Sequence, residues 1–300
     1  MEITFLGTSC MVPTKERNVQ GIYLSHKTEG ILIDCGEGSQ RQMNLAGINR
    51  NKVNTILVTH WHGDHVGGII GLLQTVSDKE NPPRIEIYGP KGTKKRIQHL
   101  LDSVVFDGSN LNLKITELNP KKIEKFKDKD DFYIECAPME HTTPCIAYSF
   151  VEKDRRKINT AKAKTIGLGP GPVLGKLQKG QKVVFKGKSI KPDDVSYVEK
   201  GKKISFIFDT LVNENCFKIA KDADLLITEA VYLPELRDKA DLYKHLTTKD
   251  SGLIANKANA KKLIITHFSQ RYKDASVLEN DVKTYFANSE GSYDFKKVKI

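Results

Sequence analysis

Six consecutive residues carry the most specific chemical pattern in this sequence. From His60 to His65 the chain reads His-Trp-His-Gly-Asp-His, directly after the apolar run Thr55–Thr59. Side chains alternate in an extended loop, so His60 and His62 can share one metal ion. Asp64 and His65 lie past a glycine and can turn toward a second ion. Because zinc takes imidazole and carboxylate ligands, and a mixed His/Asp set suits hydrolysis better than a structural role, the pattern predicts half of a two-metal hydrolytic centre.

Three further candidate ligands follow predicted strands. His141 comes after Phe132–Ala137, Asp209 after Lys203–Phe208 and His267 after Lys262–Thr266. Taken singly, each is explained as a loop residue or as a polar group satisfied in the core. Taken together, they all stand at strand ends, where α/β folds expose side chains for chemistry. We therefore expect them to complete the metal site.

A second pair of residues fits proton transfer. His245 precedes a predicted helix and does not follow a strand, so proton transfer suits it better than metal ligation. Glu229 ends the run Asp224–Thr228 and is the candidate to orient the His245 ring. The alternative for this pair is an ordinary salt bridge. His26 and His99 have no comparable setting and are expected on the surface.

These residue types suit metal-assisted hydrolysis, for example of a phosphodiester. That reaction needs a nucleophile at neutral pH and stabilisation of negative charge in the transition state, and two zinc ions can supply both. Asp64 can accept the proton of the attacking water, while His245, held by Glu229, protonates the departing oxygen. Arg271 either binds a phosphate oxygen or forms a surface salt bridge.

Short β-type runs rich in Val, Ile, Phe and Tyr are interspersed with helical patterns along the chain. The expected strands are Glu2–Leu6, Gly21–Ser25, Gly30–Ile33, Thr55–Thr59, Arg84–Tyr88, Phe132–Ala137, Cys145–Val151, Lys203–Phe208, Asp224–Thr228 and Lys262–Thr266. The expected helices are Gly67–Val76, Thr93–Val105, Val212–Ala220 and Lys249–Ala260, the last with Thr247 as N-cap and Asp250 as capping-box partner. This order predicts an α/β sandwich of two mixed sheets packed face to face, with helices outside.

Two charged segments interrupt this pattern. Asn119–Asp131 is a dense charge run and is expected to be a solvated turn. Glu152–Lys182 has nine Lys or Arg against two acids, is rich in Gly and Pro, and contains no Trp or Tyr. Long irregular connections tend to be functional or disordered, so we expect a flexible basic insert within one domain that spans residues 1–300.

The bulk composition narrows the function classes. With 300 residues, 39% hydrophobic and 28% charged, the chain is globular in type, and no apolar run approaches the ~18 residues of a membrane span. The N-terminus does not read as a secretory signal, which makes the cytoplasm the expected location. The five scattered cysteines are expected to be reduced thiols. A net charge of +11 favours a polyanionic partner, although a solvated lysine-rich surface explains the charge alone equally well.

The metal motif resembles that of the metallo-β-lactamase superfamily. The likeness is closer still to the tRNase Z family, the tRNA 3′-processing endonucleases, in their short form, and it runs essentially end to end. It rests on the segments Phe5–Cys10, Asp34–Gln40, His60–His65, Gly169–Leu177, Thr228–Ala230, His245–Thr247 and Thr266–Tyr272. Phe208 stands where many members have Gly, Leu246 where they have Ser, and Thr228 where longer relatives have His. None of these departures removes a ligand.

The resemblance implies two zinc ions per chain and a precursor tRNA as substrate. One ion would be held by His60, His62 and His141, the other by Asp64, His65 and His267, with Asp209 bridging. It also implies that Glu229 and His245 transfer a proton at the leaving group. The tRNA would keep a 3′-hydroxyl and the trailer would carry a 5′-phosphate.

The resemblance further implies that Glu152–Lys182 is a protruding arm that grips the tRNA elbow, usually of the other subunit in a homodimer. A basic arm without aromatic platforms suits a folded RNA that is read by shape and backbone. The candidate contacts in it are Arg155, Arg156, Lys176 and Lys179. Neither a membrane nor a nucleotide cofactor is expected.

Three alternatives use parts of the same pattern. A small-substrate hydrolase or another phosphodiesterase of the superfamily shares the metal motif, but the basic arm argues against a small substrate. Nucleases of the RNase J or cleavage-factor type carry a large domain between the bridging Asp and the last His, where this chain has 57 residues. A non-catalytic RNA-binding protein fits poorly, since structural zinc sites are usually closed and rich in cysteine.

Overall fold

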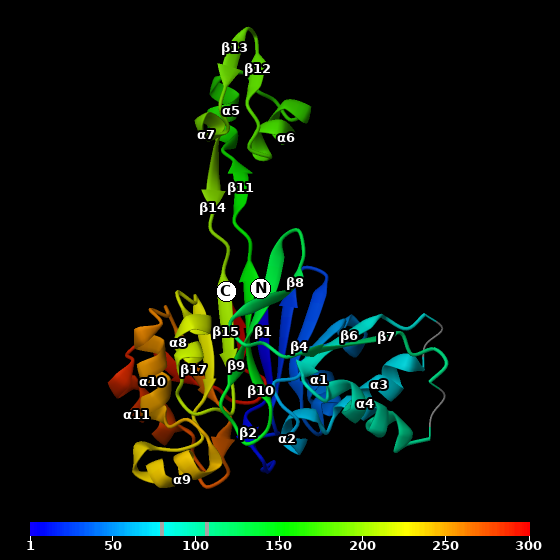
Figure 1. Cartoon of the computed structure of the whole chain (residues 1–300). Helices are drawn as coiled ribbons and strands as arrows, with labels where there is room; N and C mark the ends of the chain where they lie inside the picture. The colour runs from blue at the N-terminus through cyan, green and yellow to red at the C-terminus, as the bar shows by residue number, and fades with distance from the viewer. Residues whose placement is uncertain (79–80, 106–107) are drawn as a thin grey trace. The chain divides into compact units, whose positions relative to one another are not determined.

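Two seven-stranded mixed sheets form the centre of the computed structural model, which describes residues 1–78, 81–105 and 108–300 (Figure 1). The first sheet has the order β20 (Lys297–Lys299), β1 (Glu2–Gly7), β3 (Gly21–His26), β4 (Glu29–Cys35), β5 (Thr55–Leu57), β6 (Ile85–Pro90) and β7 (Leu113–Leu118). Adjacent strands of this sheet run antiparallel from β20 to β4 and parallel from β4 to β7.

The second sheet carries the remaining long strands. Its order is β19 (Ser289–Gly291), β17 (Leu263–Thr266), β16 (Leu225–Glu229), β15 (Lys203–Ile207), β10 (Cys145–Glu152), β9 (Phe132–Met139) and β8 (Glu124–Asp128). The strands from β15 to β19 are parallel, so their carboxyl ends lie along one edge of the sheet. A short parallel pair, β2 (Ser9–Cys10) with β18 (Phe268–Ser269), follows β1 and β17 in the chain.

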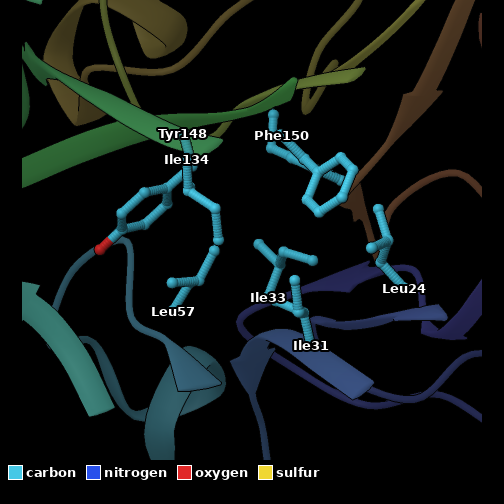
Figure 2. Close-up of a pocket in the computed structure, with 8 residues that line it drawn as sticks. Leu24, Ile31, Ile33, Leu57, Ile134, Tyr148 and Phe150 are labelled. Carbon is cyan, nitrogen blue, oxygen red and sulfur yellow. The ribbon is translucent and has the colours of Figure 1, made fainter. Parts of the chain in front are cut away.

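Apolar side chains from the two sheets meet in the space between them. Leu24, Ile31, Ile33 and Leu57 come from the first sheet, and Ile134, Tyr148, Phe150 and Phe206 from the second (Figure 2). Burying each such side chain contributes about 1.5–3 kcal/mol. The Tyr148 hydroxyl donates to the carbonyl oxygen of Val58 at 2.8 Å, which fixes the second sheet against the segment that leads into the His60–His65 motif.

Helices cover the outer face of each sheet (Figure 1). The core beside the first sheet includes side chains of α1 (Ser39–Ala46), α3 (Ile69–Ser77) and α4 (Thr93–Asp102), and the core beside the second includes those of α8 (Glu214–Ala220), α10 (Thr248–Lys257) and α11 (Ser276–Tyr285). The shorter helical elements of this part are η1 (Arg50–Lys52), α2 (Gly63–Val66), η2 (Pro234–Leu236) and α9 (Arg237–Tyr243). This is the expected α/β arrangement of two sheets between helices. No helix among the described residues is long and apolar enough to cross a membrane.

Most local predictions are confirmed. All ten expected strands are present, with ends shifted by at most two residues, and the four expected helices are present with ends shifted by at most three. The capping box at the start of α10 is formed by Thr247 and Asp250 as expected. His99 is exposed, also as expected.

Two local predictions are wrong. Asn119–Asp131 is not a simple turn, because it contains β8 (Glu124–Asp128). This strand lies at the edge of its sheet, where charged side chains are tolerated and even protective. His26 is buried, with 4% of its surface exposed, and its ring lies 5.2 Å from that of Phe150. It ends β3, and an apolar neighbour from the facing sheet covers it.

Residues Val151–Lys202, with Lys127–Tyr133, form a separate compact unit that we call the arm unit. It holds β11 (Arg155–Ile158) paired with β14 (Ser196–Glu199), and β12 (Val183–Phe185) paired with β13 (Lys188–Ile190). Its helices are α5 (Thr160–Thr165), α6 (Pro172–Gln178) and α7 (Pro192–Val195). Ala163, Leu168, Leu177 and Val195 belong to its small apolar core. The segment Glu152–Lys182 is therefore part of a folded unit that continues to Lys202.

Candidate metal centre

Several residues of the candidate site stand at strand ends whose backbone turns sharply. Asp34, Asp209 and His267 all have positive φ, at 57°, 42° and 59°. Few residues other than glycine adopt this conformation, and Asp and His are among those that tolerate it best. Such strain persists only where the surrounding structure enforces it, and it is concentrated at functional sites. Here it occurs within two residues of the ends of β4, β15 and β17 and brings these three residues to the same site.

The first group of ligand atoms lies around one oxygen of Asp209. Asp209 Oδ2 is 3.5 Å from His60 Nε2 and 3.8 Å from His141 Nε2. His62 Nδ1 lies 3.3 Å from His141 Nε2. Each of these four residues offers a ligand atom within 4.8 Å of the others, so the group is sized to hold one ion.

The second group lies around the other oxygen of the same carboxylate. Asp209 Oδ1 is 3.5 Å from His65 Nε2 and 3.5 Å from His267 Nδ1. His65 Nε2 and His267 Nε2 are 3.1 Å apart, and Asp64 Oδ2 lies 3.4 Å from His267 Nε2. The structure thus brings together all seven candidate ligands and places Asp209 between the two groups.

The outer nitrogens of three histidines are held by hydrogen bonds. His65 Nδ1 bonds to Asp34 Oδ2 at 2.8 Å, and His141 Nδ1 bonds to the carbonyl oxygen of Lys244 at 3.0 Å. His60 Nδ1 lies 3.1 Å from the hydroxyl of Thr59, which itself donates to Asp34. These partners accept the Nδ1 proton, so the Nε2 lone pairs point inward. Metal-binding histidines usually carry such a partner.

The nitrogen and oxygen atoms that face the centre of the two groups are suited to binding cations. Within the described ranges, His60 Nε2, Asp209 Oδ1 and His267 Nδ1 are buried and have no hydrogen-bond partner. Buried polar atoms without partners are costly, so their presence in one cluster indicates bound ions. Imidazole and carboxylate donors are ligands that divalent transition metals accept. The two groups are typical of a dinuclear metallo-β-lactamase centre.

Mutual electrostatics control the charge of these residues. Burial alone would lower the pKa of His65, but Asp209, Asp34 and Asp64 raise it to about 10. Burial and the neighbouring His65 lower the pKa of His60. Burial would raise the pKa of Asp209, but His267, His65 and His60 hold it well below its usual range. The protein thus keeps the Asp209 carboxylate ionised, which suits a cation, while a cation that binds at His65 Nε2 must displace the proton that the three carboxylates favour there.

His245 and Glu229 form a hydrogen-bonded pair next to the two groups. His245 Nδ1 lies 2.8 Å from Glu229 Oε2, and Glu229 Oε1 accepts from the backbone nitrogen of Thr210 at 2.8 Å. Burial would lower the pKa of His245, but Glu229 and Asp209 raise it to about 9. The His245 ring lies 3.8 Å from the Asp209 carboxylate, and both carboxylates favour its protonated form. Such a group can donate a proton.

Arg271 is exposed at the rim of this region. Its guanidinium lies 5.4 Å from the ring centroid of Tyr232, and that ring contacts His245 edge-on. The Arg271 Nε donates to the Ser269 hydroxyl. Among the described residues it forms no salt bridge, so its cation is available for an anionic ligand.

Asp34 is the supporting residue that the pattern of histidines did not reveal. It is fully buried and accepts three hydrogen bonds, from His65 Nδ1, from the Thr59 hydroxyl and from the Thr59 backbone nitrogen. It lies 31 residues before His65, at the end of a different strand. The only signal for it was the Asp34–Gln40 motif.

Replacing Asp34 with Asn is expected to weaken metal binding about 10- to 100-fold, because an amide cannot accept from both His65 and Thr59 as the carboxylate does. Competition with a chelator, followed by metal analysis, measures this. Asp294→Asn is the matched control, since Asp294 is also a well-hydrogen-bonded acid but its partners are Thr8, Asn18 and Gln42. Equal metal loss in both variants would mean that the effect is one of general stability.

Curated relatives match this chain over nearly its whole length. Ribonuclease Z of Archaeoglobus fulgidus is 37% identical over 303 residues, covering 100% of this chain and 97% of that protein. Ribonuclease Z of Thermococcus kodakarensis is 40% identical over 287 residues, covering 94% and 88%. The chain belongs to the ribonuclease Z family.

Solved structures agree with this membership. Human tRNase Z, short form, superimposes with a TM-score of 0.72 at 26% identity, covering 100% of this chain and 99% of that chain. The metallo-β-lactamase fold protein YhfI from Bacillus subtilis has a TM-score of 0.68 at 16% identity, which supports the fold alone. The metallo-β-lactamase fold expected from the motif is confirmed.

A family model described as anti-Pycsar protein Apyc1 matches residues 1–161. This is more than half of the chain, which therefore also falls within the family that the model describes. The match ends before Asp209, Glu229, His245 and His267, so it covers only the first part of the metal centre. The ribonuclease Z relatives cover all of it.

Proposed function

We propose that this chain removes the 3′ trailer from precursor tRNA as an endoribonuclease with two zinc ions. The observation that carries the proposal is the position of Asp209, whose two oxygens face two separate groups of ligand atoms in a chain that matches ribonuclease Z end to end. One ion would be held by His60, His62 and His141, the other by Asp64, His65 and His267, with Asp209 shared.

The ions, when bound, supply a hydroxide nucleophile at neutral pH and stabilise negative charge on the phosphate. Asp64 stays ionised and accepts a proton from the attacking water: burial raises its pKa, but His65 and His267 lower it well below the usual range. His245, oriented by Glu229, donates its proton to the departing oxygen. The tRNA then ends in a 3′-hydroxyl and the trailer begins with a 5′-phosphate. Arg271 binds a phosphate oxygen beside this pair.

The arm unit is the proposed tRNA-binding element. Residues 154–200 contain 12 Lys or Arg against 4 Asp or Glu, and so carry +8 of the net charge of +11. Arg155 and Arg156 already pair with Glu199 and Asp193. Lys176 and Lys179 are exposed and form no salt bridge with any residue that the structure describes, which makes these two lysines the better candidates for phosphate contacts.

Replacing residues 154–200 with a short glycine-containing turn should weaken tRNA binding and flatten its salt dependence. The backbone nitrogen of Glu152 bonds to the carbonyl oxygen of Lys202, so the two cut ends lie side by side. Removing each side chain that binds a phosphate is expected to reduce the slope of log K against log salt by about 0.7–0.9. Cleavage of a small phosphodiester should persist.

Two double variants refine this test. Lys176→Ala with Lys179→Ala is expected to weaken tRNA binding more than Arg155→Ala with Arg156→Ala, because the arginines are already neutralised within the arm. An unchanged salt slope after the deletion would show that the arm unit does not bind phosphates.

We further propose that the protein acts in the cytoplasm as a homodimer in which the arm of one subunit binds the tRNA that the other cleaves. The support is the likeness to the short-form family. Light scattering measures the mass of the assembly. Mixing an arm-deleted subunit with an Asp64→Asn subunit, which keeps the arm but is expected not to cleave, tests whether one subunit's arm serves the other's site: activity of the mixture above that of either parent is expected.

Cleavage mapping on a precursor tRNA, with metal analysis of the same sample, tests the proposed function. About two zinc ions per chain and a single cut that leaves a 3′-hydroxyl are expected. Binding without cleavage by the metal-loaded protein would contradict it. Efficient turnover of small esters with no effect on precursor tRNA would instead favour a small-substrate hydrolase of the same fold.

A further inference from the structure

One cysteine lies at the metal centre. Cys35, Cys136, Cys145 and Cys216 are buried away from solvent, whereas Cys10 is half-buried. A ligand atom from each of Cys10, Asp64 and His267 lies within 4.8 Å of the other two. Of the three residues, only Asp64 and His267 belong to the ligand set described above.

The backbone holds Cys10 in this place. Strand β2 pairs with β18, so that Cys10 lies opposite Ser269, and the backbone nitrogen of Phe268 donates to the carbonyl oxygen of Thr8 at 2.8 Å. The thiol is therefore tied to the strand that begins directly after His267. This connection does not depend on side-chain packing.

Met11, the residue after Cys10, holds Asp64, which is the third member of the cluster. The backbone nitrogen of Met11 donates to Asp64 Oδ2 at 2.8 Å, and Met11 has a φ of 60°. A positive φ at a long side chain is strained, and the Met11 side chain itself is 76% exposed and gains nothing from packing. The strained backbone at Met11 thus orients its nitrogen toward Asp64, and this hydrogen bond places Asp64 beside Cys10.

His267 is the buried member of this cluster and connects it to Asp209. His267 has no exposed surface, and its Nε2 lies 3.4 Å from Asp64 Oδ2, while its Nδ1 faces Asp209 Oδ1 at 3.5 Å and has no hydrogen-bond partner among the residues that the structure describes. Around a zinc ion, sulfur at about 2.3 Å and nitrogen or oxygen at about 2.0–2.2 Å from the ion lie roughly 3–4 Å apart when they are neighbouring ligands. Three ligand atoms within 4.8 Å of one another are compatible with that spacing.

We propose that the Cys10 thiolate is an additional ligand of the ion that Asp64, His65 and His267 hold. This inference rests on the proposed metal centre. On binding, the thiol releases its proton to solvent and a sulfur lone pair forms the metal–sulfur bond, with no change of oxidation state. Because thiolate is a soft ligand, this half of the centre prefers Zn²⁺ and Cd²⁺ to Mn²⁺.

Cadmium titration of the metal-free protein tests the inference through an optical signal. Thiolate–cadmium bonds give an ultraviolet charge-transfer band that imidazole and carboxylate ligands do not give. The wild-type protein is expected to develop the band as the second ion binds, and Cys10→Ser is expected to lose it. Cys136→Ala is the matched control, since Cys136 is buried in β9, and it should keep the band. The ratio of Cd²⁺ to Mn²⁺ affinity should fall in Cys10→Ser and stay unchanged in the control.

The outcomes separate this inference from the proposed function. Wild-type protein that binds two ions and cleaves precursor tRNA but shows no band would overturn the role of Cys10 alone. A band that persists in Cys10→Ser would do the same. Failure to bind metal at all would contradict the proposed function together with this inference. Circular dichroism and a thermal unfolding midpoint for both variants establish that they are folded.

Discussion

Asp64→Ala is expected to abolish cleavage of precursor tRNA while leaving tRNA affinity nearly unchanged. The Asp64 carboxylate lies 3.4 Å from His267 Nε2 and 3.5 Å from His65 Nε2, so its removal takes away a proposed anionic ligand of the second ion. The same change removes the proposed acceptor of the water's proton. The arm unit, which carries most of the positive charge, is untouched.

The variant Asp64→Asn distinguishes an effect of the lost negative charge from an effect on the fold. Asparagine keeps an oxygen that can accept from the backbone nitrogen of Met11, a bond worth about 1 kcal/mol, but it lacks the negative charge. We expect the Asn variant to fold and bind tRNA like the wild type, and to lose metal and cleavage like the Ala variant. Single-turnover cleavage, filter binding and metal analysis of each variant measure this. Parallel loss of cleavage and tRNA binding would show that Asp64 is structural.

The grouping of the candidate ligands was predictable from the sequence because they follow apolar strands. Parallel strands of one sheet end at the same edge. Asp209, Glu229 and His267 lie at, or within two residues after, the ends of β15, β16 and β17, and therefore had to lie close together. In the pairing of β16 with β17, Glu229 lies opposite Thr266, which is the residue before His267. Local pattern and sheet topology therefore determine this part of the site.

Contacts that depend on tertiary packing were not predictable in this way. Asp34 and Lys244 support His65 and His141 across 31 and 103 residues, one through a side chain and the other through a backbone carbonyl. A backbone carbonyl has no sequence signature. Cys10 was interpreted as an ordinary reduced thiol because nothing in the sequence reveals the β2–β18 pair that brings it to His267.

The arm unit shows a different limit of prediction from the sequence. Its glycine- and proline-rich composition identified a special segment, but the pattern fades after Lys182, whereas the strand that pairs with β11 is β14, at Ser196–Glu199. An antiparallel partner can lie at any distance along the chain. The ion pairs of Arg155 and Arg156 with acids near residues 193–199 were hidden for the same reason.

His245→Ala is expected to reduce the rate of the chemical step about 10²- to 10⁴-fold, with little effect on the apparent affinity for precursor tRNA. The ring lies 2.8 Å from Glu229 Oε2 and is 11% exposed, so it is preorganised and partly shielded from water. Removing it leaves the departing oxygen without a proton donor. Metal content should stay near two ions per chain, because His245 is not a proposed ligand.

Glu229→Gln tests whether His245 acts as an acid and not only as a packing residue. Glu229 and Asp209 raise the pKa of His245 to about 9 against the effect of burial, so activity that needs the protonated ring should decline as pH rises through that value. Without the Glu229 charge the pKa falls, and the alkaline decline should move toward neutral pH. A precursor whose departing oxygen is replaced by sulfur, a better leaving group, should restore cleavage in His245→Ala. An unshifted pH profile together with no rescue by sulfur would show that His245 only supports the fold of the site.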